Sequence, residues 1–557
     1  MQFIQIVKTM FRKIQILFIA AVSLSGLHAQ KTTSVTPQKP KLVVGLVVDQ
    51  MRWDYLYRYY DKYESGGFKR MLSQGYSLNN VHINYVPTYT AVGHTTIYTG
   101  AVPAIHGIAG NDWYDRNTGK NVYCTADSTV QAVGTTAQSA GQHSPRNLWS
   151  TTITDQLRLA TNFQAKVIGV SLKDRASILP AGHNPTGAFW FDDSTGNFIT
   201  STYYMPQLPK WVSDFNSKKT GDELVKNGWN TLLPVAQYTE SSPDNSPWEG
   251  LLGSAKTPVF PYSNLAADYA AKRDNIRYTP FGNTLTLRMA EAAVKGESLG
   301  TGAVTDFLAI NLASTDYAGH KFGPNSVEVQ DVYLRLDRDL AEFFNYLDKT
   351  LGKDQYTVFL SADHGGAHSE GFMEAHKMPT GFYGETSKKD YNQLLKDKFN
   401  SDKIVTKVTN NQVYLDRRLI QQNKLDEEVV KAYLIDRLNE DPSILFAVDM
   451  KKAASSSVPE PIKTRIINGY NWQRSGDIQL IYHDNWLPSY SKLGTTHGAW
   501  NSYDSHIPLI FMGWGIKAGE SNRDYNMTDI APTLAALLHI QFPSGNVGNP
   551  IVEVIGK

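Results

Sequence analysis

The chain has 557 residues, a formal net charge of +1 and one cysteine, Cys124. The balanced charge gives no sign of a nucleic-acid-binding surface, and a single cysteine excludes an intrachain disulfide and a cysteine-rich zinc finger. With 41% hydrophobic and 19% charged residues, the composition is that of an ordinary globular protein. Any bound metal must therefore be held by carboxylate, imidazole and hydroxyl groups, and we interpret Cys124 as a small, inert residue.

The first 29 residues predict a cleaved secretory signal peptide. Lys8, Arg12 and Lys13 form a basic start, residues 14–27 are apolar but too few to span a bilayer comfortably, and Ala29 provides a small residue for cleavage. An uncleaved N-terminal membrane anchor is the alternative. We expect a periplasmic or secreted protein without a stable membrane anchor after cleavage.

Continuous apolar runs along the rest of the chain predict strands that are buried on both faces. These runs are Leu42–Val48, Lys166–Val170, Asp306–Leu312, Tyr356–Leu360 and Ile507–Met512.

Helical patterns separate the apolar runs. Apolar residues recur at spacings of three and four over Val329–Leu347, which predicts a long amphipathic helix. The pattern recurs from Leu285, with Asn283 as the expected N-cap, and residues 528–529 are expected to cap a last helix with Pro532 in its first turn. Alternating strands and helices predict an α/β fold, a three-layer sandwich with a mostly parallel central sheet.

Two long stretches interrupt this alternation. Residues 184–275 are rich in Trp, Pro, Ser and Asn, and residues 379–494 contain short helical and strand patterns of their own. We predict that residues 30–557 form one catalytic domain and that these two stretches are insertions covering its active site.

Three aspartates follow predicted strands. Asp49 comes directly after the first apolar run, and Asp316 and Asp363 come shortly after the third and fourth. Because ligands of such sheets bind beyond the carboxyl ends of the strands, we expect the three carboxylates to lie together. The alternative for Asp49 is a simple N-cap of the next helix.

Histidines accompany these aspartates. His320 lies four residues after Asp316, on the same side of a helical turn, and residues 363–366 read Asp-His-Gly-Gly, two adjacent ligands before two glycines that allow a tight bend. His497 lies in a turn-like stretch between Thr496 and Gly498. Any one of these residues alone is more often structural, but together the six Asp and His residues predict a metal site.

The ligand types indicate which metal and which chemistry to expect. Carboxylates and imidazoles without thiolate suit zinc and, less often, manganese, and two-metal sites perform in-line displacement at phosphorus. A hydroxyl bound to such a metal becomes a nucleophile near neutral pH. Thr90 is the candidate, in a loop that leads into a predicted helix whose first N–H groups would face a phosphoryl oxygen. The alternative is that Thr90 only caps that helix.

The ordered set of motifs resembles the alkaline phosphatase superfamily, and most closely its threonine-nucleophile, phosphate-insensitive alkaline phosphatases of flavobacterial type. The resemblance runs from Lys41 to about Leu538. Besides the ligand segments, it rests on three further segments, which read Pro-Thr-Tyr-Thr-Ala-Val-Gly-His at 87–94, His-Gly-Ile-Ala-Gly-Asn at 106–111 and Ser-Leu-Lys-Asp-Arg at 171–175.

The resemblance implies two Zn²⁺ ions and assigns their ligands. One zinc would be held by Asp316, His320 and His497. The other would be held by Asp49, Asp363 and His364, with Thr90 reaching it.

The resemblance also assigns Asn111, Lys173 and Arg175 to the non-bridging phosphoryl oxygens, and these charge-assisted donors suit a phosphate monoester dianion. Without the resemblance, the alternative is that Lys173 and Arg175 are a pair of exposed residues in a turn. We assign structural roles to His94 and His106, which also match the family pattern.

The leading interpretation is a secreted, zinc-dependent phosphomonoesterase that releases phosphate from small monoesters through a phosphothreonine intermediate, acting as a monomer. A phosphodiesterase or nucleotide pyrophosphatase of the same superfamily is the closest alternative, but two cations at one oxygen suit a monoester better. A sulfatase is disfavoured because no formylglycine-forming Cys or Ser pattern surrounds Thr90, and a cytosolic mutase is disfavoured by secretion. A non-catalytic phosphate- or zinc-binding protein is the remaining alternative.

Overall fold

The computed structural model describes residues 4–13, 38–383, 388–488 and 492–556. It divides into two compact units, residues 1–39 and residues 40–557. In the first unit, residues 4–13 form an exposed helix. Most of the predicted signal peptide, residues 1–3 and 14–29, lies outside the described residues. In the part of the chain that is described, no helix combines the length and the hydropathy needed to cross a membrane.

The second unit is built on one large central sheet. Its strands lie in the order β18 (Gly519–Ser521), β2 (Tyr76–His82), β17 (His506–Gly513), β10 (Tyr356–Ser361), β1 (Leu42–Val48), β9 (Asp306–Leu312), β6 (Val167–Ser171), β7 (Gly187–Asp192), β8 (Asn197–Ser201) and β5 (Ala132–Val133), with β19 (Tyr525–Asn526) beside β2. The run from β10 to β7 is parallel. All five predicted strands are present, and the last of them, β17, runs antiparallel to β10.

The register of the three central strands fixes the position of the predicted site. Val47 of β1 pairs with Ser361 of β10 on one side and with Asn311 of β9 on the other. The carboxyl ends of β10, β1 and β9 therefore lie side by side. All three strands are completely buried, so the backbone that leads into the site is held firmly from both faces.

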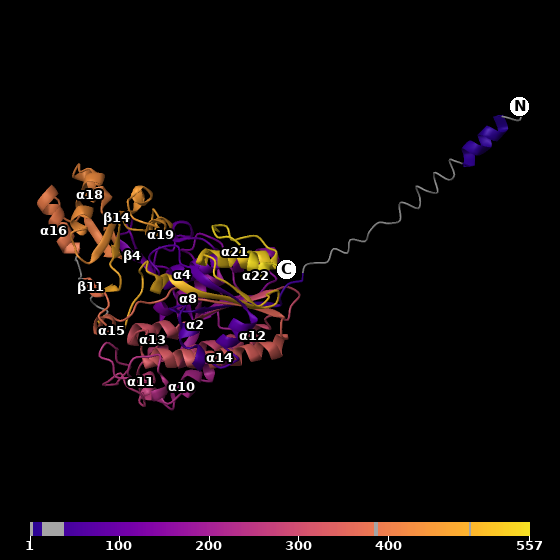
Figure 1. Cartoon of the computed structure of the whole chain (residues 1–557), viewed down its shortest axis with the longest axis horizontal. Helices are drawn as coiled ribbons and strands as arrows, with labels where there is room; N and C mark the ends of the chain where they lie inside the picture. Colours follow the sequence, from indigo (N-terminus) through magenta and orange to yellow (C-terminus); the bar gives the residue numbers. More distant parts are fainter. Residues whose placement is uncertain (1–3, 14–37, 384–387, 489–491, 557) are drawn as a thin grey trace. The chain divides into compact units, whose positions relative to one another are not determined.

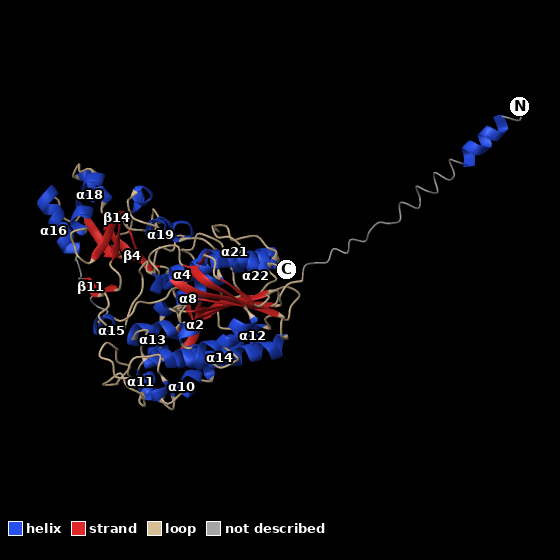
Figure 2. Ribbon diagram, in the orientation of Figure 1, coloured by secondary structure: helices blue, strands red, loops and turns tan. Residues whose placement is uncertain are grey.

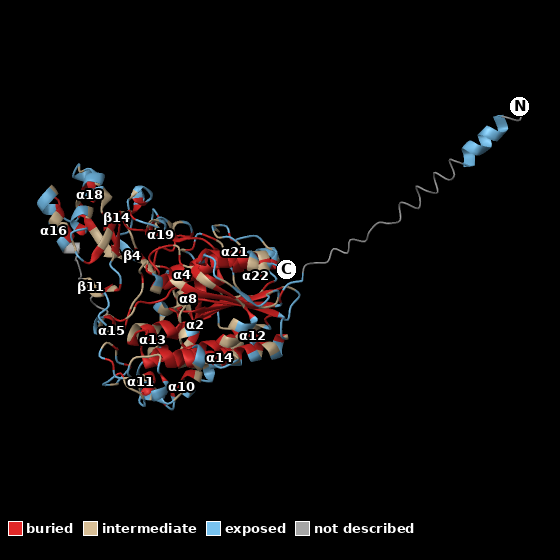
Figure 3. Cartoon of the chain, viewed as in Figure 1, coloured by how far each residue is buried: buried red, intermediate tan, exposed pale blue. Residues whose placement is uncertain are grey.

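Helices cover both faces of the sheet, as Figure 2 shows. One face carries α12 (Pro280–Glu297), α13 (Ser314–Phe322) and α14 (Val327–Leu351), and the other carries α4 (Thr90–Thr99), α8 (Asp174–Ala181) and α21 (Ile530–Leu538) (Figure 1). Buried residues concentrate in the sheet and on the helix faces turned toward it (Figure 3). The predicted three-layer α/β sandwich with a mostly parallel sheet is confirmed.

One predicted helix start is wrong. Asn283 lies inside α12, which begins three residues earlier at Pro280 with Thr279 in the N-cap position. Its side chain is buried, and its Oδ1 accepts a hydrogen bond from the backbone N–H of Ser314, at 2.9 Å. Asn283 therefore supports the first turn of α13, the helix that carries Asp316, instead of capping its own helix.

The last predicted helix is present with a different cap chemistry. Asp529 occupies the N-cap position of α21 and Pro532 lies in its first turn. The Asp529 carboxylate accepts hydrogen bonds from the backbone N–H groups of Asn526 and Asn549 and none from α21. A further short helix, α22 (Val552–Ile555), follows α21.

The two predicted insertions differ in their structure. Residues 184–275 contribute β7 and β8 to the central sheet before they continue into α9 (Lys210–Ser217), α10 (Thr220–Val225) and α11 (Leu265–Ala271). Residues 379–494 contain a separate four-stranded sheet, in the order β12 (Val405–Thr409), β13 (Gln412–Leu415), β15 (Ile478–Tyr482) and β14 (Ile444–Asp449), with a hydrophobic core of its own. The boundaries of the insertions and their covering role stay predictions.

Candidate active site

The six predicted Asp and His ligands lie together at the carboxyl ends of β1, β9 and β10. Nε2 of His320 is 3.2 Å from Oδ1 of Asp316, and Nε2 of His497 is 3.8 Å from the same oxygen. Nε2 of His364 is 3.3 Å from Oδ2 of Asp363 and 3.7 Å from Oδ1 of Asp49. The structure thus joins segments that are up to about 450 residues apart in the sequence.

Three groups of ligand atoms lie within 4.8 Å of one another, close enough to hold a metal ion. They are Asp316 with His320 and His497, Asp49 with Asp316 and His364, and Asp49 with Asp363 and His94. The first group is the predicted set for one zinc. In the third group His94 takes the place that the prediction gives to His364, so the geometry offers two histidines for the second ion.

The three predicted histidine ligands are oriented by backbone carbonyls. Nδ1 of His320 lies 2.9 Å from the carbonyl oxygen of Thr495, and Nδ1 of His497 lies 2.7 Å from that of Thr88. Nδ1 of His364 makes the same contact with Gly365, at 2.9 Å. A carbonyl only accepts, so each Nδ1 carries a hydrogen, and in the neutral imidazole each Nε2 then has the lone pair, on the side of the carboxylates.

Thr90 begins α4, with the extended residue Tyr89 in the N-cap position. Its hydroxyl Oγ1 lies 3.3 Å from Nε2 of His364 and 3.5 Å from Nζ of Lys173. The side chain is buried and makes no cap hydrogen bond to its own helix. The simple capping interpretation of Thr90 is therefore wrong, and the hydroxyl faces the Asp and His cluster.

Lys173 lies inside the carboxylate cluster. Its Nζ donates to Oδ1 of Asp49 at 2.9 Å and to Oδ2 of Asp316 at 2.6 Å. The backbone N–H of Lys173 donates to Oγ of Ser171 at 2.8 Å, which fixes the turn between β6 and α8. Lys173 is only 2% exposed, so it is not part of an exposed turn pair.

Asn111 and Arg175 flank this cluster. Oδ1 of Asn111 accepts from the backbone N–H of Ala91, at 2.9 Å, which fixes its amide beside the first turn of α4. Nη1 of Arg175 donates to the hydroxyl of Tyr123 at 3.1 Å, and its buried Nε has no hydrogen-bond partner. Arg175 and Lys173 line the same pocket of about 330 Å³. The guanidinium of Arg175 thus has a donor, Nε, that no protein acceptor uses.

The charges of the site shift several pKa values. Burial and the neighbouring Asp363 carboxylate raise the pKa of Asp49 to about 7, although Lys173 opposes them. Burial would also raise the pKa of Asp316, but Lys173, His320 and His497 together outweigh it and hold that pKa well below its ordinary value. Three buried carboxylates share one ammonium, so the cluster is short of positive charge.

Some of the supporting residues were not predicted. Gln50 donates from Nε2 to Oδ1 of Asp316 at 2.9 Å and from its backbone N–H to Oδ1 of Asp363 at 3.2 Å. Asn311, in β9, donates to Oδ2 of Asp49 at 3.0 Å. Two features of the sequence could have indicated these roles: Gln50 directly follows Asp49, and Asn311 is a polar residue within an apolar strand.

His94 and His106 are buried in different surroundings. Nδ1 of His94 lies 3.0 Å from the carbonyl oxygen of Thr90 and 3.4 Å from Oδ2 of Asp363, and its buried Nε2 has no hydrogen-bond partner. His106 contacts Oγ1 of Thr96 at 3.2 Å, and burial lowers its pKa to about 3. His106 thus has structural contacts, while His94 lies next to the candidate ligands.

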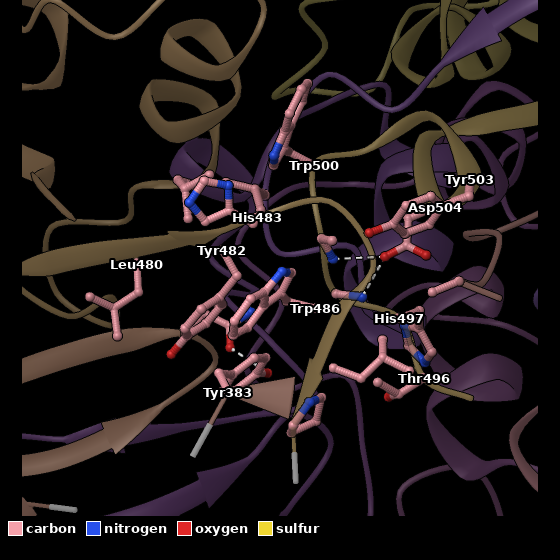
Figure 4. Close-up of a pocket in the computed structure, with 18 residues that line it drawn as sticks. Tyr383, Leu480, Tyr482, His483, Trp486, Thr496, His497, Trp500, Tyr503 and Asp504 are labelled. Atoms are coloured by element: carbon pink, nitrogen blue, oxygen red, sulfur yellow. Dashed lines mark hydrogen bonds between the residues drawn. The ribbon is translucent and has the colours of Figure 1, made fainter. Parts of the chain in front are cut away.

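A second, smaller cavity of about 30 Å³ adjoins Thr496 and His497 (Figure 4). The rings of Tyr383 and Tyr482 stack beside it with their centroids 3.7 Å apart. This volume has room for only a few water molecules. The larger pocket at Lys173 and Arg175 is therefore the better place for a substrate.

The glycines of the site permit close packing and need no unusual backbone. A Cβ on Gly365 would lie 2.1 Å from the carbonyl oxygen of Tyr503, and a Cβ on Gly93 would lie 2.2 Å from that of Asp363. Neither glycine has a positive φ. Close approach of neighbouring backbone is therefore the reason for glycine at positions 93 and 365. The predicted tight bend at residues 365 and 366 needs no left-handed backbone and stays a prediction.

We expect Gly93→Ala to lower both the thermal stability and kcat/KM on an aryl phosphate. The new methyl group would push the backbone that carries Asp363, and overpacking of this kind costs about 1–3 kcal/mol. Gly302→Ala is the matched control, because a Cβ at Gly302 has no atom within 4 Å. If the two variants behaved alike, the close contact at Gly93 would have no part in positioning Asp363.

Comparison with known proteins identifies the family. A family model described as type I phosphodiesterase/nucleotide pyrophosphatase matches residues 43–504. Alkaline phosphatase PafA of Elizabethkingia meningoseptica is 69% identical over 531 residues, which are 95% of this chain and 97% of PafA. The crystal structure of wild-type PafA matches with a TM-score of 0.92, covering 93% of this chain and 100% of that chain.

A structure of a PafA variant also matches, with 68% identity, a TM-score of 0.91 and the same coverage. In that variant one threonine is replaced by serine, and one asparagine, one lysine and one arginine are each replaced by alanine.

The chain therefore belongs to the type I phosphodiesterase/nucleotide pyrophosphatase family, within the alkaline phosphatase superfamily. It is an enzyme of the alkaline phosphatase type, a hydrolase of phosphoric monoesters. The non-catalytic alternative is thereby excluded.

Proposed function

We propose that this chain is a zinc-dependent phosphomonoesterase that forms a phosphothreonine intermediate at Thr90. The position of the Thr90 hydroxyl carries this proposal. It lies at the N-terminus of α4, within 3.5 Å of both the imidazole of His364 and the ammonium of Lys173. A nucleophile, metal-type ligands and a cation for the phosphoryl group thus meet at one point.

The residues of the site fit two zinc ions. The donor set consists of carboxylates and imidazoles without thiolate, and a buried oxygen of Asp363, Oδ2, has no hydrogen-bond partner. We assign one zinc to Asp316, His320 and His497. We assign the other to Asp49, Asp363 and His364, with Thr90, because Nε2 of His364 is the imidazole nitrogen beside the Thr90 hydroxyl.

Bound zinc would act as a Lewis acid that lowers the pKa of a hydroxyl and neutralises charge on phosphoryl and leaving-group oxygens. The protein residues supply the nucleophile and hold the phosphoryl group. The Thr90 hydroxyl gives up its proton as Oγ1 forms a new P–O bond in line with the ester P–O bond. The ester P–O bond breaks, and the leaving oxygen takes up a proton and departs as the alcohol. Water then attacks the phosphothreonine, which releases inorganic phosphate and restores the Thr90 hydroxyl.

Asn111, Lys173 and Arg175 would bind the non-bridging oxygens of the phosphoryl group. Lys173 reaches within 3.5 Å of the Thr90 hydroxyl, and the buried Nε of Arg175 is a donor without a protein partner. The threonine, asparagine, lysine and arginine substituted in the PafA variant have the same spacing along its chain as Thr90, Asn111, Lys173 and Arg175 have here. This agreement supports a joint role of the four residues.

A preference for monoesters follows from the two cations, and it separates this proposal from the diesterase alternative that the family model's description favours. We expect the double variant Lys173→Ala/Arg175→Ala to lose monoesterase kcat/KM sharply and diesterase kcat/KM much less. Each lost donor in a water-excluded site costs ~3 kcal/mol of transition-state stabilisation, and the two losses need not add. Rates on an aryl phosphate and on the matching methyl aryl diester measure the ratio.

Arg146 supplies the matched control, because its guanidinium is exposed and pairs with Asp127, outside this cluster. Arg146→Ala should leave both activities unchanged. If the double variant lost both activities in equal proportion, Lys173 and Arg175 would have a general structural role and no selectivity for monoesters. That result would favour the diesterase alternative.

We further propose that the protein is periplasmic or secreted and acts as a monomer on small phosphate monoesters. The basic start, apolar stretch and small residue before Gln30 support export. N-terminal sequencing of the purified native protein should give Gln30 as the first residue. Retention of the first 29 residues would indicate the membrane-anchor alternative.

A further inference from the structure

A second acidic cluster lies outside the candidate active site, between a long loop and the first turn of α14. Asp244 and Glu249 belong to the loop that runs from Ser241 to Tyr262, and Glu328 is the second residue of α14. Glu249 is 3% exposed and Glu328 is fully buried. Carboxylates are almost never buried to this extent unless they are paired.

Most of the oxygens of this cluster have no partner. Both carboxylate oxygens of Glu249, Oε2 of Glu328 and Oδ1 of Asp244 are buried without a hydrogen-bond partner. Oε1 of Glu328 accepts from the hydroxyl of Tyr262 at 2.5 Å, and Oδ2 of Asp244 accepts from the backbone N–H of Phe260 at 3.1 Å. Among the described residues, no Lys, Arg or His forms an ion pair with any of the three carboxylates.

The pKa values of two of these carboxyl groups are raised, as expected for buried acids without a cation. Burial, and after it the neighbouring carboxylates of Glu328 and Asp244, raise the pKa of Glu249 to about 10. Burial likewise raises the pKa of Glu328 to about 8, although the hydrogen bond from Tyr262 opposes it. Such shifts arise where acidic groups share a low-dielectric site that lacks a cation.

We propose that Asp244, Glu249 and Glu328 form a binding site for a hard divalent cation, and that Ca²⁺ is the cation that fits best. The side-chain donors are carboxylate oxygens alone, which hard cations prefer and which do not select zinc or copper. A cation at this point would bind the carboxylate oxygens that have no hydrogen-bond partner, and its charge would offset the repulsion among the three carboxylates.

The looseness of the cluster favours calcium over magnesium. Among the described residues, the groups of three ligand atoms within 4.8 Å of one another all lie in the candidate active site. The second cluster must therefore contract when it binds. Ca²⁺ accepts irregular geometry and completes about six to eight ligands with backbone carbonyls and water, whereas Mg²⁺ demands a near-ideal octahedron.

The loop also contacts the backbone beside the candidate active site. The carbonyl oxygen of Trp248 accepts from the N–H of Gly494 at 2.7 Å, and the N–H of Gly250 donates to the carbonyl oxygen of Lys321, also at 2.7 Å. Lys321 directly follows His320. A cation that ties the loop to α14 would thus steady the backbone next to His320 as well as the fold.

Equilibrium dialysis with Ca²⁺ tests the site on the zinc-loaded enzyme, in buffers freed of calcium by a chelating resin so that zinc is retained. Metal analysis should find one Ca²⁺ per chain in the wild type and none in Glu249→Gln, at unchanged zinc content. Ca²⁺ should also raise the thermal unfolding temperature of the wild type and not of Glu249→Gln. Glu223→Gln, at an exposed carboxylate, is the matched control and should bind as the wild type does.

Two further measurements keep the proposal falsifiable. Asp244→Asn, at a half-buried position, should fold even if Glu249→Gln does not, and it should weaken Ca²⁺ binding at least about tenfold. Tb³⁺, a calcium substitute, should show emission sensitised by Trp229, whose ring stacks on Tyr262 with a centroid distance of 5.5 Å.

The proposal fails if the wild type binds no Ca²⁺ at millimolar concentration and Glu249→Gln is more stable regardless of calcium. The carboxyls would then be held as neutral acids. Calcium that survives both Glu249→Gln and Asp244→Asn would lie elsewhere, including the candidate active site, and would equally overturn the assignment.

Discussion

Thr90→Ala should lower kcat on an aryl phosphate by at least about a thousandfold while the zinc content and the fold are retained. The reason is that neighbouring hydroxyls are already engaged. Oγ1 of Thr88 donates to the carbonyl oxygen of Ala499 at 3.0 Å, and Oγ1 of Thr315 donates to backbone carbonyls of Asp49 and Leu312. Neither Thr88 nor Thr315 is therefore free to replace Thr90 as the nucleophile.

Thr90→Ser is the matched variant, because it keeps a hydroxyl at the same point and should keep considerable activity. Its phosphoenzyme should be trapped by acid quenching with labelled substrate and mapped to residue 90, while Thr90→Ala should give none. Near wild-type turnover in Thr90→Ala would instead indicate direct attack of water on the ester, without a phosphothreonine.

Removal of metal is the second change with a very large expected effect. A strong chelator should abolish activity, and zinc should restore it better than magnesium does, because the three histidines present Nε2 lone pairs that magnesium does not prefer. Metal analysis at each stage, together with turnover of an aryl phosphate, measures the dependence. Zinc should also raise the unfolding temperature, because it binds the folded centre and neutralises Asp49, Asp316 and Asp363.

Asp316→Asn serves as the companion variant, and Asp222→Asn, outside the centre on α10, as its control. Only the former should lower the zinc content. Full activity after exhaustive chelation, with metal analysis near zero, would remove the two-zinc assignment and leave the histidines as structural residues.

Much of the fold could be predicted from the sequence because its strands are buried on both faces. A strand of this kind is a continuous apolar run, and β1 and β9 have the bounds that their runs predicted. The direction of a strand has no such local signature. Ile507–Met512 reads like the parallel strands, yet β17 runs antiparallel to β10, and only the path of the chain decides this.

For the candidate site, too, the sequence predicts some features and the tertiary structure decides others. The types and order of its Asp, His and Thr residues are read directly from the sequence. Asp49, Asp316 and Asp363 follow β1, β9 and β10, whose carboxyl ends lie side by side. The resemblance to a family, and not spacing, supplied the grouping of those ligands into two sets. The structure supports the set of Asp316, His320 and His497 and offers His94 beside His364 for the other.

What the sequence alone determined is therefore five strands of the central sheet, the types of the candidate ligands and, through the family resemblance, the class of enzyme. Only the tertiary structure decided which side chains meet across long separations. Asn283 supports Ser314 instead of its own helix, and Gln50 reaches Asp316. Such contacts have no local pattern, because burial and hydrogen bonding there depend on the neighbouring element in space and not on the neighbouring residue in the chain.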